Sequence, residues 1–339
     1  MGAIVESASP RIAGQRILSG IQPSGVQHLG NYFGAVRQFI ALQEKNRAAY
    51  FMADLHSLTS IHDAKTRREL TRGVALDFLA LGVDPQRSIL YRQSDFPEVA
   101  ELAWVLTTVT PMGLLQRAVS YKDKLAQGLS PDHGLFAYPV LQAADILIWR
   151  ADCVPVGQDQ KQHLEMTRDI AVKFNLAYGE VLKLPEPYIL EGTAVVPGVD
   201  GKKMSKTAGN GVEMFAPEKA LRRQIMGIVT DSKGVDEPKD PDDNTVYKLY
   251  TLFANAEERA AMAQAFRQGG LGYGDAKKAL LDKVLAYFGP ARERRRELEA
   301  RPDVVEDILR DGIARARSET AELMDDVRRA AGLGPAREK

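Results

Sequence analysis

Two lysines in a glycine-flanked loop are the first residues of this sequence that suggest a chemistry. Residues 203–207 read Lys-Met-Ser-Lys-Thr, with Gly201 before them and Gly209 after them. Lysines three positions apart in a mobile loop could clamp a polyphosphate, although most such pairs on protein surfaces are only solvated charges. A functional role for this pair is better supported because a second polar turn, at residues 22–31, lies near the other end of the chain.

The turn at residues 22–31 has the pattern of an anion site. An apolar run at 16–20 predicts a strand, and His28-Leu29-Gly30-Asn31 then opens a helical pattern. Free N–H groups at a helix N-terminus attract phosphate, so His28 and Asn31 are candidate phosphate-binding residues. Gly30 has no Cβ, so a flat adenine or a ribose could approach its backbone. The alternative is an ordinary strand-to-helix turn. The turn lacks GxGxxG, which makes nicotinamide binding a weak interpretation.

One carboxylate stands in an apolar helical segment. Tyr138, Gln142 and Asp145 are spaced i, i+4 and i+7, which places them on one face of a helix. Asp145 is surrounded in sequence by Ala, Ile, Leu and Trp, and a carboxylate is costly to bury without a hydrogen-bond donor. The donor could be an N–H or O–H of a ligand, or a neighbouring arginine or backbone amide. Both possibilities remain open on these residues alone.

A third polar turn follows a predicted strand at 153–157. In Gly157-Gln158-Asp159-Gln160, the Asp159 carboxylate could accept from ribose hydroxyls, and Gln160 could bind an amino or carboxylate group. The alternative is a solvated helix start capped by Asp159. His56 follows another predicted strand and could line the same cleft, although a lone histidine is more often structural.

The elements that position these turns alternate between strands and helices. Strands are predicted at 16–20, 49–53, 88–93 and 153–157, and helices at 32–42, 65–82, 97–109, 111–118, 137–149 and 159–175. This alternation predicts an α/β fold with a Rossmann-like, doubly wound parallel sheet. Ligands bind such sheets beyond the carboxyl ends of the strands, where the turns after the first and fourth predicted strands should meet.

The pattern changes near residue 217, after which helices dominate. They are predicted at 217–228, 244–254, 257–267, 275–288 and 304–332. We therefore expect a disordered leader at 1–15, a catalytic domain at 16–210 and an all-helical domain at 211–339. A cluster of four arginines, Arg292, Arg294, Arg295 and Arg296, is interleaved with glutamates and favours a solvated helix face.

Composition sets broad limits on what the chain does. It has 339 residues, 45% hydrophobic and 27% charged, which are values of an ordinary globular protein of about two domains. The single cysteine, Cys153, allows no intrachain disulfide and is expected to be buried, as in a protein of the reducing cytoplasm. We expect no membrane association. The formal net charge of zero gives no support for non-specific nucleic-acid binding, although a local basic patch would be enough.

Taken together, the motifs resemble a known family. Segments 20–25, 28–31, 138–147, 154–163 and 203–207 occur in the order found in class I aminoacyl-tRNA synthetases, and they are most similar to tryptophanyl-tRNA synthetases of the bacterial or organellar type. The resemblance implies an enzyme that joins tryptophan to tRNA(Trp), using ATP and Mg²⁺. It also implies a Rossmann catalytic domain, a helical anticodon-binding domain and a homodimer.

The resemblance also implies roles for particular residues. The expected ATP-binding residues are Gln22, Pro23, Ser24, Gly30, Asn31, Gly157, Gln158, Asp159, Val195, Lys203, Met204, Ser205, Lys206 and Thr207. The expected tryptophan-binding residues are Gln22, His56, Tyr138, Gln142, Asp145 and Gln160, with Asp145 receiving the indole N–H. The residues expected to act in catalysis are three of the ATP-binding residues and one neighbour: Asn31, Lys203, Lys206 and His28. Mg²⁺ is expected to be bound through the ATP phosphates rather than by protein ligands.

Three positions depart from the family pattern. Asn31 stands where many class I enzymes have a second histidine, Thr207 replaces serine, and Gln142 replaces a methionine. The alternatives are a tyrosine-specific synthetase, a nucleotidyltransferase that shares the His-x-Gly-x turn, and a catalytically silent RNA-binding paralogue. The lysine loop and the long helical extension argue against a nucleotidyltransferase. The intact Asp145 and lysines argue against a silent paralogue.

Overall fold

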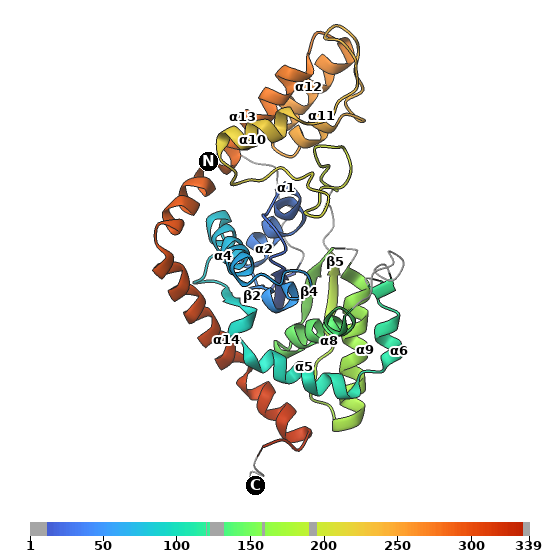
Figure 1. The fold of residues 1–339 in the computed structure, drawn as a ribbon, viewed down its shortest axis with the longest axis vertical. Helices are drawn as coiled ribbons and strands as arrows, with labels where there is room; N and C mark the ends of the chain where they lie inside the picture. Colours follow the sequence, from blue (N-terminus) through green and yellow to red (C-terminus); the bar gives the residue numbers. More distant parts are fainter. Residues whose placement is uncertain (1–11, 120, 123–131, 158–159, 190–194, 335–339) are drawn as a thin grey trace.

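A computed structural model of the chain describes residues 12–119, 121–122, 132–157, 160–189 and 195–334. Most of the predicted leader at 1–15 therefore lies outside the described residues. The described part divides into a strand-containing region and a helical region that follows it (Figure 1).

Five parallel strands form one sheet in the order β3-β2-β1-β4-β5. They are β1 (Arg16–Ile21), β2 (Arg47–Met52), β3 (Ile89–Arg92), β4 (Cys153–Val156) and β5 (Glu186–Ile189). The chain runs outward from β1 to β3 and then crosses to the other side of β1 to form β4. The order therefore reverses between β1 and β4, which confirms the predicted doubly wound fold.

The sequence patterns missed β5. Its residues, Glu-Pro-Tyr-Ile, contain Pro187, and proline is normally evidence against a strand because it has no N–H to donate to a ladder. Here β5 is the last strand of the sheet and pairs only with β4, with Pro187 opposite Val154. An edge strand tolerates the missing donor, so the proline does not prevent pairing.

Helices cover both faces of the sheet. They are α1 (Leu29–Asn31), η1 (Tyr32–Val36), α2 (Arg37–Leu42), α3 (Asp54–Ser57), α4 (Ala64–Leu81), η2 (Gln93–Asp95), α5 (Pro97–Val109), α6 (Met112–Gln116), α8 (His133–Ile148) and α9 (Lys161–Tyr178). One hydrophobic core joins α2 and α4 to one face, and a second joins α5, α8 and α9 to the other. Gly82 ends α4 in the left-handed conformation (φ 115°), as expected for its cap. Cys153 is buried, as predicted.

The helical region is built from five helices among the described residues. They are α10 (Glu218–Met226), α11 (Thr245–Tyr250), α12 (Ala256–Gln268), α13 (Tyr273–Glu299) and α14 (Pro302–Ala330). The prediction that a helix ends at 288 was wrong, because α13 continues through Pro290 for several more turns. Proline in a helix removes one hydrogen bond and crowds the preceding turn. Tertiary contacts made beyond Pro290 offset that cost.

Those contacts come from the arginine cluster, and they correct the prediction that it is a solvated face. Arg295 forms an ion pair with the buried Asp77 of α4 (Nε–Oδ1 2.7 Å). Arg294 donates to the carbonyl of Ala80 (3.0 Å), and Arg292 donates to two carbonyls just after the lysine loop. Arg294 and Arg296 are both largely exposed, and Arg296 pairs only with a glutamate one turn away. The cluster fastens α13 to the sheet-containing region.

Helix α14 runs back along the sheet and covers the edge strand β3 (Figure 1). A Cβ placed on Gly312 would lie 1.8 Å from the carbonyl oxygen of Leu90 in β3, so only glycine allows this approach. Ion pairs from Arg92 to Glu306 (2.7 Å) and from Arg328 to Glu101 (2.6 Å) hold the helix in place. No helix in the described part of the chain is long and apolar enough to cross a membrane.

Candidate active site

The turn after β1 and the lysine loop meet at the carboxyl end of the sheet, and we call this region the lysine end of the site. His28 is buried at the start of α1, and Asn31 closes the turn by accepting the His28 backbone N–H at its Oδ1 (3.1 Å). The Leu29 N–H donates to the carbonyl of Val212 (2.9 Å). The first turn is thus joined to the segment that follows the loop.

Asn210 organises the loop itself. Its buried side chain accepts the Ser205 N–H (2.9 Å) and donates to Asp200 (2.8 Å) and to the carbonyl of Lys203 (3.2 Å). A Cβ on Gly198 would lie 2.4 Å from this side chain, so glycine is needed there for the loop to fold back on itself. Both motif lysines therefore extend from a loop whose base is held by hydrogen bonds.

The loop reaches the first turn through Met204 and Lys206. Met204 is buried, and its sulfur accepts the Gly30 N–H (3.3 Å), while a Cβ on Gly30 would press on His28 and Met204. The Lys206 ammonium donates to the carbonyl of Gln22 (3.3 Å). A cavity of about 420 Å³ opens here between Ser24, Gly25, His28, Ser205 and Lys206 and the start of the helical region.

Burial changes the protonation of both basic groups at this end. It lowers the pKa of Lys206 to about 8, against a small opposing effect of Asp77. It also lowers the pKa of His28 to about 4, and the Lys206 charge adds to that shift. His28 is thus neutral at physiological pH and acts as a hydrogen-bonding group rather than a cation.

Two buried side chains at the lysine end lack partners among the described residues. They are His28, at Nδ1, and Gln27, at both the nitrogen and the oxygen of its amide. Buried polar groups are nearly always hydrogen-bonded, so such groups mark a place that a ligand or water would complete. Sequence reasoning did not single out Gln27, which is a polar residue between two cavity-lining neighbours.

Asp145 lies at the other end of the site, which we call the carboxylate end. It is only 1% exposed, and its partners are His56 (Nε2–Oδ2 2.9 Å) and Gln93, whose amide nitrogen lies 2.8 Å from both carboxylate oxygens. Burial raises the pKa of Asp145, while the hydrogen bonds from His56 and Gln93 oppose that rise. The predicted alternatives of an arginine or a backbone amide partner were wrong.

Three more of the expected tryptophan-binding residues, Tyr138, Gln142 and Gln22, can be placed relative to Asp145 or His56. Tyr138 donates to or accepts from His163 (Oη–Nε2 2.6 Å), and its ring meets that of His56 edge to face. Gln142 lies half-buried on the same helix, α8, as Asp145. Gln22 connects the two ends, because its amide donates to the His56 carbonyl (3.3 Å) while its own carbonyl receives Lys206.

The remaining expected residues border this region or lie outside the described chain. Gly157 follows β4, and the Gln160 N–H donates back to its carbonyl (3.0 Å). Gln158 and Asp159 fall outside the described residues. Pro23 is buried after β1, Lys203 and Thr207 are loop residues, and Val195 is 67% exposed. Their expected contacts with ATP stay predictions.

Sequence reasoning missed Gln93 and Asn210. Gln93 directly follows β3, so the rule that ligands gather beyond strand ends could have identified it. Nothing in the sequence pattern distinguishes Asn210 from other loop asparagines, because its role depends on how the loop folds back.

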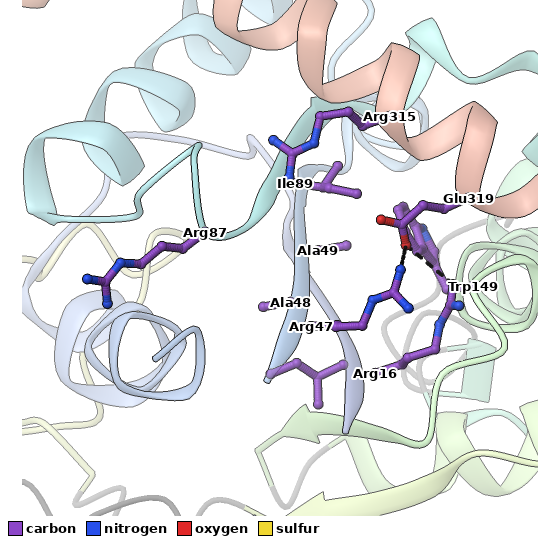
Figure 2. A pocket seen from close by; sticks show the side chains of 10 residues that line it. Arg16, Arg47, Ala48, Ala49, Arg87, Ile89, Trp149, Arg315 and Glu319 are labelled. Carbon is purple, nitrogen blue, oxygen red and sulfur yellow. Dashed lines mark ion pairs between the residues drawn. The ribbon is translucent and has the colours of Figure 1, made fainter. Parts of the chain in front are cut away.

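A smaller cavity of about 150 Å³ lies at the opposite edge of the sheet, at the amino ends of β1, β2 and β3 (Figure 2). Its arginines are already paired: Arg16 and Arg47 with Glu319 of α14 (3.7 and 3.0 Å), and Arg315 with the carbonyl of Pro85. Arg87, which points away, pairs with carboxylates outside it. This cluster holds α14 against the sheet and is remote from the candidate site.

Comparison with known proteins agrees with this geometry. The family model described as tRNA synthetases class I (W and Y) matches residues 13–289. The tryptophan–tRNA ligase of Fusobacterium nucleatum is 53% identical over 94% of this chain and 98% of its own length, and that of Rhodopirellula baltica is 52% identical over 94% and 99%. The crystal structure of Campylobacter jejuni tryptophanyl-tRNA synthetase complexed with ADP and tryptophan is 46% identical, covers 94% of this chain and 100% of its own, and superposes with a TM-score of 0.90.

The chain therefore belongs to the class I tRNA synthetases for tryptophan and tyrosine. Its fold is that of this class. Within the class, the relatives that match nearly its whole length are tryptophan–tRNA ligases. The family match excludes the alternative of a nucleotidyltransferase.

Proposed function

We propose that the lysine end binds ATP, that the carboxylate end binds tryptophan, and that Gln22 holds the two in register. The observation that carries this proposal is the link from Lys206 through Gln22 to His56 and Asp145. It supports a site in which a nucleotide phosphate and an amino acid meet beyond the ends of β1 and β2. Tryptophan would then form tryptophanyl-adenylate and pyrophosphate, followed by transfer to the 3′ end of tRNA(Trp).

Adenylate formation makes simple demands on this chain. The tryptophan carboxylate, with a pKa of about 3.5, is already ionised and attacks the α-phosphorus without a general base. What remains is in-line positioning and neutralisation of the charge on the departing pyrophosphate. Lys203 and Lys206 would supply positive charge, and the side chains of His28 and Asn31 would supply hydrogen bonds. The predicted free N–H groups of this helix start would not contribute, because the backbone N–H groups of residues 28–31 already donate within the protein. The loop lysines would act chiefly near the transition state.

Mg²⁺ would enter with ATP and neutralise part of the phosphate charge. The expected phosphate-binding side chains fit phosphate oxygens rather than a metal, because His28, Asn31, Lys203 and Lys206 offer nitrogen donors and no carboxylate. Among the described residues, no group of three or more His, Cys, Asp or Glu side chains is placed to hold a metal ion. The residues of this chain would therefore bind the phosphates that carry the ion.

At the carboxylate end, Asp145 would accept the indole N–H. Phenylalanine has no ring donor and would leave a buried carboxylate without its last partner, which a polar site rejects strongly. Tyrosine does carry a donor, but its smaller ring would have to reach the same carboxylate. Tyr138, Gln142, Gln160 and His56 would form the rest of the wall.

The partners follow from the same proposal. We propose that the helical region at 211–339 contacts the tRNA anticodon, since α11 and α12 stand away from the sheet (Figure 1).

We also propose a homodimer formed through α5, α6 and α9, which expose Trp104 (70%), Met112 and Leu176 (75%) to solvent. Sedimentation of Trp104→Arg would show a monomer if α5 lies in that interface. Translation in the cytoplasm is the expected setting.

ATP–pyrophosphate exchange tests the proposed function. We expect exchange with tryptophan and none with tyrosine or without an amino acid. Exchange driven by tyrosine would contradict the proposed selectivity. Exchange with tryptophan that survives Lys206→Ala and Asp145→Asn unchanged would show that these residues do not form the site.

A further inference from the structure

We propose that Gln93 is a positioning residue for tryptophan selection: it fixes the Asp145 carboxylate and ties it to the turn that carries His56. The inference rests on the proposed role of Asp145 as acceptor of the indole N–H. Gln93 itself need not touch the substrate, so its effect is exerted through Asp145.

The contacts of Gln93 use both halves of its amide. The side chain is fully buried (0% exposed), its nitrogen donates toward both oxygens of Asp145 (2.8 Å each), and its oxygen accepts the Leu55 N–H (3.0 Å). A carboxylate can only accept and a backbone N–H can only donate, so these two neighbours fix which end of the amide faces which. One side chain therefore connects α8 to the turn beyond β2.

Counting acceptor sites shows what this arrangement leaves for a ligand. An ionised carboxylate offers about four lone-pair positions. Gln93 places its amide nitrogen 2.8 Å from both oxygens, which fits one N–H shared between them, and His56 lies 2.9 Å from Oδ2. These two partners leave acceptor capacity on the carboxylate for a further donor such as an indole N–H. Loss of Gln93 would free the carboxylate to turn and would leave a buried charge with a single partner.

The surrounding bonds hold Gln93 firmly enough for this role. Gln93 begins η2 directly after β3, and the next residue, Ser94, binds Asp54 through its N–H (2.9 Å) and hydroxyl (2.6 Å). The ends of β2 and β3 are thus joined by two separate sets of hydrogen bonds. Gln93 is therefore held by the hydrogen bonds between the segments that follow β2 and β3, and it can in turn fix the position of Asp145.

The first test is Gln93→Met, which keeps length and apolar volume but removes both amide groups. In ATP–pyrophosphate exchange we expect the KM for tryptophan to rise by about tenfold or more, as for lost hydrogen bonds to a charged group, while the KM for ATP stays unchanged. The matched control is Gln43→Met. Gln43 is also buried, donates to the Gly82 carbonyl (2.8 Å) and accepts the Asp84 N–H (2.9 Å), far from the site. It should lose stability without a change in either KM.

The second test is Gln93→Glu, compared with wild type at pH 6 and pH 8. An ionised glutamate would repel Asp145, whereas a protonated one can donate an O–H to it, so the variant-to-wild-type ratio of tryptophan KM should fall as the pH is lowered. The titratable groups around this position are Asp145 of α8, Asp54 and His56 of α3, and Tyr91 of β3. They are present in both proteins, so a pH dependence found only in the variant reports the new glutamate together with its coupling to these groups.

The outcomes separate this inference from the proposed function. If wild type shows no tryptophan-dependent exchange, the proposed function itself is wrong. If Asp145→Asn raises the KM for tryptophan and Gln93→Met does not, the positioning role is wrong while the proposed function stands. Should Gln93→Met not fold, the pH ratio of Gln93→Glu decides, and a ratio that does not change with pH overturns the inference.

Discussion

The two ends of the site differ in how completely their polar groups are satisfied. At the carboxylate end, Asp145, His56 and Gln93 bind one another in a buried network. At the lysine end, buried atoms of His28 and Gln27 have no partner among the described residues, and Lys206 rests on a backbone carbonyl. The carboxylate of Asp145 is thus held in place by other side chains of the protein, whereas His28 and Gln27 at the lysine end have buried polar atoms that no described residue bonds.

This difference suggests that the carboxylate end selects the amino acid, whereas the lysine end promotes its reaction with ATP. A preorganised acceptor discriminates between amino acids without moving, because its partners already fix its direction. A loop that is completed only by polyphosphate can instead reserve its charge for the reacting state. We therefore expect changes at the carboxylate end to alter tryptophan binding and changes at the lysine end to alter the rate of adenylate formation.

The largest expected effect is that of Lys206→Ala. It should lower the kcat of ATP–pyrophosphate exchange by about 10²-fold or more, comparable to losing a preorganised oxyanion donor, with little change in the KM for tryptophan. The exposed neighbour Lys202 provides the control as Lys202→Ala, which should keep wild-type kinetics. A change confined to the KM for tryptophan would contradict the division between the two ends.

Asp145→Asn should change the KM for tryptophan rather than the kcat of exchange. Removing the buried charge that His56 and Gln93 bind should raise the KM for tryptophan by roughly 10- to 100-fold, the range expected when a hydrogen bond to a charged group is lost. Exchange kinetics at varied tryptophan would measure it. Asp152→Asn, which alters a carboxylate at the far edge of the sheet, is the control. A fall in kcat alone would not fit selection at this end.

The pH dependence of ATP use should report on Lys206. Its pKa is lowered to about 8, so the ammonium is charged below that pH and loses its proton as the pH rises through it. The kcat/KM for ATP should decline above about pH 8, approaching a tenfold loss per pH unit if the charged form alone is active. In Lys206→Arg the decline should disappear, because a guanidinium stays charged. Identical profiles for the two proteins would assign the titration to another group.

The smallest expected effect comes from Gly312→Ala. Its Cβ would collide with the Leu90 carbonyl of β3, the strand that leads into Gln93, so unfolding should become easier by about 1–3 kcal/mol. The KM for tryptophan should rise more than that for ATP, because only the carboxylate end depends on β3. Chemical denaturation and exchange kinetics would measure both.

Gly289→Ala is the matched control for that variant. Gly289 lies within α13, and nothing stands within 4 Å of the added Cβ, so this change should stabilise the protein by up to about 1 kcal/mol. Equal destabilisation by both changes would show that the close approach of α14 to β3 is not the cause.

Much of the fold and part of the site could be predicted from the sequence. Four of the five strands and the order of the helices follow from hydrophobic periodicity, and the turn at 22–31 follows from polar residues after a strand. What could not be predicted depends on distant partners. The helix through Pro290 needs Arg295 to meet Asp77, and the network around Asp145 needs Gln93.

Helix α14 adds a consequence for how the protein is made. Val305 and Leu309 enter one hydrophobic core, while Leu323 and Val327 enter the other. During synthesis, the sheet would therefore leave the ribosome with its β3 edge bare until nearly the last helix has emerged. The nascent chain would therefore carry an exposed strand edge, a surface that can pair with other chains, until α14 packs against it.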